Sequence, residues 1–254
     1  MDRTGWKAFL ERWNEELFIA GAQPHTELGK PLTDGWLGHP PASQEQVAAL
    51  EERLGCVLPP SLREFLLVSD GWQMFGCFGG ELRGTGELGW LRDLDRMYAE
   101  AYDEFDEFAD EAAILRRGLM LSHGADAGVL FLDPGDVDEA GEWAAYETYS
   151  WTAAGLERQG SFHELIRHLY AGFHALERPQ CQTQREWDAK VEQARLAVLA
   201  GGVDGPMAVL EEARDYGIPA RPVRRAPADP PLRPVVHARR AAAVRQRCGQ
   251  GAAG

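Results

Sequence analysis

The chain has 254 residues, 44% of them apolar, and a formal net charge of −14, so it can build a sizeable core beneath an acidic surface. No run approaches the about 18 consecutive apolar residues of a membrane span, and the first residues lack the basic start and apolar run of a secretory signal. An acidic chain repels nucleic acid and anionic membranes, so neither is expected as a partner. Four widely spaced cysteines without a CxxC pair fit reduced thiols, and the expected localisation is therefore cytoplasmic.

The charge is unevenly distributed along the sequence. Residues 221–254 contain eight Arg and one Asp, a net charge of +7, so residues 1–220 carry −21. The basic tail consists mainly of Arg, Pro, Ala and Gly, a composition that predicts disorder. The acidic remainder would attract a cationic partner, although acidity that only maintains solubility is the alternative.

The N-terminal part predicts three helices. The first covers residues 4–19 with Thr4 as its cap, and a connection rich in Gly and Pro follows to residue 42. Ser43 and Gln46 fit a capping box at the start of the second helix, and Gly55 fits its left-handed end. Pro59 and Pro60 form a rigid corner before a third helix, which ends at Asp70-Gly71.

The middle of the chain predicts a sheet and one acidic helix. Short strands are expected at 72–82, 88–91, 119–122, 129–132 and 142–151, the last two joined by a hairpin loop. A single helix is expected over 93–112, with nine acidic residues and one arginine. Its expected inner face consists of Leu94, Met97, Tyr98, Ala101, Phe105 and Phe108.

The C-terminal part predicts further helices. A second capping box, Ser161 with Glu164, opens a strongly amphipathic helix that extends to about residue 176. Two shorter helices are expected around 186–199 and 206–216. The fold class is therefore α+β, a mostly antiparallel central sheet flanked by helices, with extra C-terminal helices and a disordered basic tail.

The chemical motifs predict no catalytic site. His163 and His168 lie five residues apart, about 140° around a helix, whereas zinc ligation from one helix face needs histidines four apart. The loop from Asp136 to Glu147 has partial calcium-loop spacing, but Ala140 supplies no ligand. No Gly-x-Ser-x-Gly turn occurs, and an enzyme that uses the region of His123 is kept as an alternative. No catalytic residue, metal or cofactor is expected.

The order of several motifs resembles the SUKH superfamily, which groups fungal cell-wall-assembly regulators with bacterial toxin-immunity proteins. The resemblance covers residues 43–176: Leu54-Gly55, the Leu58-Pro59 corner, Phe65-Leu66, Asp70-Gly71-Trp72, the strand Gly128 to Pro134, and the closing Ser161 to Leu165. Asp70 stands where Asn is commoner, and the acidic helix looks like an elaboration. The expected division is 1–42, N-terminal helix and loop; 43–178, SUKH-like domain; 179–220, helical extension; and 221–254, tail.

The resemblance implies a non-catalytic protein-binding domain. Bacterial relatives are thought to neutralise protein toxins, so we expect a toxin-neutralising immunity protein that binds a basic toxin domain stoichiometrically. A regulatory or scaffold module without a toxin partner is the alternative. Trp72 and Trp151 are candidate anchors, with core packing as their alternative role, and a group of carboxylates would steer the partner: Asp103, Glu104, Asp106 and Glu107.

Overall fold

The computed structural model describes residues 1–21, 35–73, 80–100, 102, 106–122, 128–149 and 155–218. These residues belong to one compact unit of α+β architecture, as the sequence predicts. The predicted disordered tail, residues 221–254, lies outside the described residues. Every helix in the described ranges is too short or too polar to cross a lipid bilayer.

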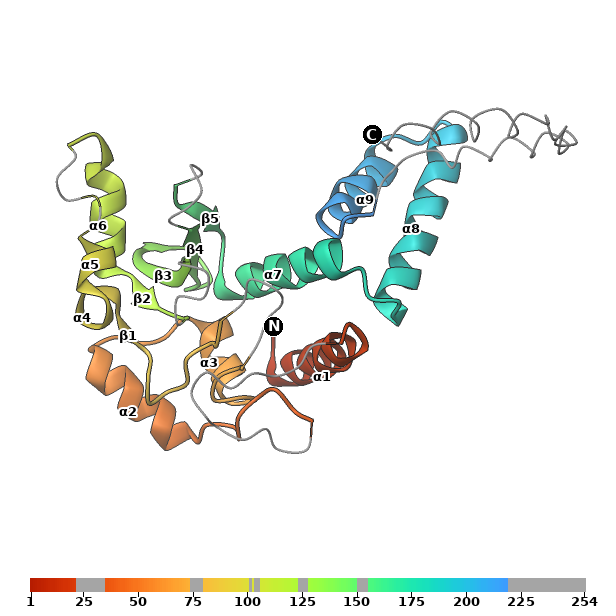
Figure 1. Ribbon diagram of the computed structural model, residues 1–254. Coiled ribbons are helices and arrows are strands. Elements are labelled where there is room, and N and C mark those ends of the chain that lie inside the picture. Colours follow the sequence, from red (N-terminus) through yellow and green to blue (C-terminus); the bar gives the residue numbers. More distant parts are fainter. Residues whose placement is uncertain are drawn as a thin grey trace, which may run out of the picture. The chain divides into compact units, whose positions relative to one another are not determined.

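Three helices open the chain: α1 (Arg3–Ile19), α2 (Gln44–Leu54) and α3 (Pro60–Leu66) (Figure 1). The predicted capping box is present at Ser43, Gly55 ends α2 in the left-handed conformation, and Pro60 is the first residue of α3. The prediction of Thr4 as the α1 cap is wrong. Asp2 caps the helix instead, because its carboxylate reaches the Gly5 N–H at 2.8 Å.

Five antiparallel strands form one sheet in chain order: β1 (Gly89–Trp90), β2 (Leu119–Met120), β3 (Gly128–Val137), β4 (Trp143–Tyr149) and β5 (Glu157–Gln159). The predicted β3–β4 hairpin is confirmed. Strand β5 was not predicted, because its three polar residues show no alternation. The expected strand 72–82 is reduced to single bridges at Trp72 and Leu82, and residues 74–79 are outside the described ranges.

The single acidic helix expected over 93–112 is wrong. The segment forms α4 (Leu91–Leu94), α5 (Arg96–Ala99), the 3-10 turn η1 (Asp106–Phe108) and α6 (Ala109–Arg117). Asp95 separates the first two, with φ −143° and ψ 82°, and its side chain accepts a hydrogen bond from the Tyr98 N–H. An Asp that caps a new helix competes with continuation of the old one.

Three helices complete the described chain: α7 (Phe162–Glu177), α8 (Gln182–Leu199) and α9 (Asp204–Asp215). Ser161 caps α7 by accepting from the Glu164 N–H. The Glu164 carboxylate accepts from the Gly160 N–H, one residue before the position that the predicted capping box would use. The other two helices lie where the sequence predicts them, with earlier starts.

Alternate residues of β3 point to opposite faces of the sheet, and each face has its own core. Leu130 and Leu132 belong to the larger core, which α1, α3, α7 and the last helices cover. Val129 and Phe131 belong to the smaller core beneath α4–α6. The larger core also takes buried side chains from α1 and from residues after 178, so both flanks of the predicted 43–178 domain pack into the same interior: Trp6, Trp13, Trp187 and Tyr216.

A buried polar cluster joins α1 to the C-terminal helices. Glu16 Oε2 accepts a hydrogen bond from the Tyr170 hydroxyl at 2.5 Å and lies 3.1 Å from His174 Nε2. The Tyr170 hydroxyl is also 3.0 Å from Thr183 Oγ1. Burial alone would raise the pKa of Glu16, but the bonds to His174, Thr183 and Tyr170 outweigh it and lower the pKa to about 2. Glu16 is therefore a buried anion held by its partners.

Candidate functional site

Of the four carboxylates predicted to steer a partner, the structure describes the side chain of one, Glu107, beside α6. Glu107 is exposed in η1, and Asp106 belongs to the same turn, although its side chain is not among those described. Asp103 and Glu104 are outside the described residues. The layer α4–α6 also exposes Asp93, Glu100 and Asp110. The described part of this layer therefore exposes four carboxylates together with three arginines, Arg92, Arg96 and Arg116, and Arg96 pairs with Glu100 at 2.7 Å.

The same layer exposes large apolar side chains that the sequence assigned to an inner face. Met97 is 84% exposed, Leu94 44% and Phe108 37%. The expected inner face assumed one continuous helix, and the break at Asp95 changes which residues face the sheet. Tyr98 still packs against the smaller core. Apolar side chains that solvent reaches are available for contact with a partner.

Arg117 attaches this acidic layer firmly to the sheet. Its guanidinium donates to both carboxylate oxygens of Asp133 on β3, at 2.5 and 2.6 Å, and the Asp133 side chain is almost fully buried. The hydrogen bonds to Asp133 raise the pKa of Arg117. A two-pronged charged pair of this kind fixes orientation as well as adding energy. The ion pair therefore fixes the end of α6 relative to β3.

Of the two tryptophans predicted as partner anchors, the structure describes only Trp72. Trp72 is fully buried, with its ring 5.1 Å from that of Trp36 and 6.3 Å from that of Trp13. The Trp72 ring therefore packs in the core, its alternative role, and has no surface to offer a partner. Trp151 and the alternative catalytic His123 lie outside the described residues.

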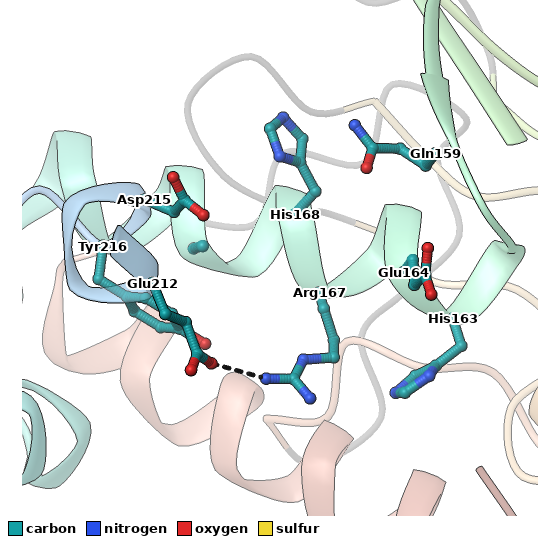
Figure 2. A pocket seen from close by; sticks show the side chains of 9 residues that line it. Gln159, His163, Glu164, Arg167, His168, Glu212, Asp215 and Tyr216 are labelled. Carbon is teal, nitrogen blue, oxygen red and sulfur yellow. Dashed lines mark hydrogen bonds and ion pairs between the residues drawn. The ribbon is translucent and has the colours of Figure 1, made fainter. Parts of the chain in front are cut away.

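A pocket of about 350 Å³ lies between the end of the sheet, α7 and α9 (Figure 2). Arg167 on α7 forms an ion pair with Glu212 on α9, with Nη2 and Oε1 3.2 Å apart. The His168 side chain points away from the α7 face that carries Arg167. His163 and Asp215 also line it. The sequence identified the two histidines only as polar-face residues, because periodicity does not show which helix packs beside them.

Burial and charge shift the pKa values of the two histidines in opposite directions. Burial lowers the pKa of His163, whose Nε2 has no hydrogen-bond partner among the described residues. The Glu147 carboxylate raises the pKa of His168 against the effect of burial. Burial also raises the pKa of Tyr216 and keeps its hydroxyl protonated. The described residues that line the pocket are mostly charged or polar, with carboxylates from Glu164, Glu212 and Asp215 beside the two histidines.

Two side-chain groups among the described residues bring three ligand atoms within 4.8 Å of one another. One is Glu16, His174 and Cys181, all buried, and its first two members belong to the polar cluster described above. The other is Glu147, Glu157 and His168, at the edge of the sheet. The sequence predicted neither group, since their members come from separate elements.

One protein-family model matches half of the chain. The model described as the SMI1 / KNR4 family (SUKH-1) covers residues 41–167. This span runs from the loop before α2 to the middle of α7, and it includes the whole sheet and the acidic layer. A search of curated proteins returned no match.

Proposed function

Because the chain belongs to the SMI1 / KNR4 family (SUKH-1), we propose that it is a non-catalytic binding protein that neutralises a protein toxin stoichiometrically in the cytoplasm. The family match over residues 41–167 is the observation that carries this proposal, since members of the family are often toxin-immunity proteins.

The layer α4–α6 is the proposed docking surface. Its exposed carboxylates favour a basic partner and would speed the encounter by long-range attraction. Met97, Leu94 and Phe108 would then supply apolar contact once the surfaces meet, because their exposed area is removed from water on docking. Trp151 remains a proposed aromatic anchor for the partner.

Co-expression with the product of the neighbouring gene tests the proposed function. The chain should rescue growth from that product's toxicity and should co-purify with it in a one-to-one complex. A neighbour that is harmless, or that is toxic but neither bound nor neutralised, would contradict the immunity role. A harmless neighbour that still co-purifies would favour a regulatory or scaffold role.

Charge reversal on the acidic layer should slow formation of this complex. Replacing Asp103, Glu104, Asp106 and Glu107 by lysine should lower the association rate by about tenfold or more at low salt and flatten its salt dependence, while dissociation changes less. Stopped-flow mixing at two salt concentrations measures this effect. A control reverses four acidic residues of other helices: Glu11, Glu15, Asp188 and Glu192. If both variants associate equally fast, steering does not come from this layer.

A further inference from the structure

Two glutamates face each other directly across the edge of the sheet. Glu147 of β4 and Glu157 of β5 are register partners, so their side chains leave the sheet on the same side. Like charges placed directly opposite each other on neighbouring strands destabilise the pairing. Strand β5 is the edge strand and has three residues, so it has little other pairing to offset this repulsion.

The third member of the group comes from the helix that covers this side of the sheet. His168 of α7 places Nε2 at 3.0 Å from Glu147 Oε1. Donor atoms of Glu147, Glu157 and His168 all lie within 4.8 Å of one another. Small side-chain movements would bring these three atoms to the about 2.0–2.2 Å bond lengths that zinc makes with imidazole nitrogen and carboxylate oxygen.

The Glu147 carboxylate is also buried, so its negative charge needs a positively charged partner. Its residue is 4% exposed, and apart from the 3.0 Å contact with His168 Nε2, no hydrogen bond from the described part of the chain reaches Oε1. A carboxylate oxygen enclosed in this way carries a large desolvation cost unless it is paired. Glu157 adds a second negative charge, so a single histidine proton would neutralise only part of the group.

We propose that Glu147, Glu157 and His168 bind one divalent transition-metal ion, of which zinc is the best fit. Imidazole nitrogen together with carboxylate oxygen is a donor set that zinc accepts, whereas calcium and magnesium prefer oxygen alone. The ion removes the repulsion between the paired glutamates and ties β5 to β4 and to α7. His168 and Glu157 are on the exposed side, so an ion can enter from solvent.

The buried group Glu16, His174 and Cys181 fits a metal less well. Its Glu16 Oε2 already accepts from Tyr170 and contacts His174, so its charge is used in protein contacts. Glu16 and Cys181 are almost fully buried and His174 completely, which leaves an ion no open route. This group instead serves as a control for where zinc binds.

Titration calorimetry of the untagged full chain with zinc chloride tests the site. One ion per chain should bind, and Glu157→Gln or His168→Gln should each weaken binding by at least about 100-fold, because loss even of an outer partner of a metal ligand costs about 10–100-fold. His163→Gln, on the same helix, should bind as the unaltered chain does. The midpoint of heat unfolding should rise with zinc in the unaltered chain and in His163→Gln, and stay constant in the other two variants.

Two results would contradict the proposed zinc site. No stoichiometric binding, or binding that both ligand variants retain, would contradict the site. Loss of binding in Cys181→Ser, with both ligand variants unaffected, would place the ion in the buried group instead. Circular dichroism without zinc separates these results from misfolding, since Glu157 and His168 lie on the exposed side and their variants should fold as the unaltered chain does.

Discussion

Replacing Trp6 by alanine should lower the free energy of unfolding by about 3–5 kcal/mol, as large-to-small changes at buried aromatic positions do. The Trp6 ring is completely buried, and its Nε1 donates to the Ser61 carbonyl at 3.1 Å. Ring centres of Phe65 and Phe162 lie 5.4 and 5.6 Å away. Alanine would leave a cavity at this junction and remove the hydrogen bond to Ser61, and each adds to the loss.

A second aromatic residue of the same helix provides the control. Phe18 is 38% exposed, so Phe18→Ala should cost less than about 1 kcal/mol. Urea unfolding of the three proteins measures both effects. Equal stability of the two variants would mean that α1 is an appendage of the family domain, as the predicted boundary at residue 43 allows. A large difference would make α1 an integral part of the fold, although it precedes the matched residues 41–167.

Local features of the fold were predictable because they depend on residues close in sequence. The capping box at Ser43, the left-handed Gly55 and the start of α3 at Pro60 each follow from side-chain chemistry within a few residues. The prediction of one helix over residues 93–112 was wrong for a local reason as well. Its apolar spacing fits one helix, but Asp95 caps a new helix and ends the old one.

Contacts between distant elements were not predictable from the pattern. Glu16 and His174 are 158 residues apart, and periodicity places them only on helix faces without naming the opposite helix. The same limit applies to Glu147, Glu157 and His168, because strand β5 shows no alternation and its pairing with β4 arises from the backbone. Trp72 illustrates the opposite case, in which the sequence left anchor and core roles open and the structure buries the ring.

Replacing Glu16 by glutamine should remove a pH-dependent part of the stability worth about 3 kcal/mol at neutral pH, since a pKa difference of one unit corresponds to about 1.4 kcal/mol. The pKa of Glu16 is lowered from 4.5 to about 2 in the folded chain, so folding favours its ionised form. That stabilisation is fully present above pH 4.5 and is lost as the pH falls towards 2. Glutamine has nearly the same shape but cannot ionise, so its stability lacks this dependence.

Urea unfolding at pH 7, 5, 4 and 3 would measure the difference between Glu16→Gln and the unaltered chain. The difference should be constant at pH 7 and above, and its pH-dependent part should fall to about two fifths of that value at pH 3. Glu15→Gln is the matched control, because Glu15 is exposed on the same helix and its variant should follow the unaltered chain at every pH. A Glu16→Gln difference that stays constant from pH 7 to 3 would mean that Glu16 is not the buried anion that joins α1, α7 and α8. If the stability difference between Glu16→Gln and the unaltered chain shrinks in acid, the negative charge of Glu16 stabilises the packing of α1 against α7 and α8.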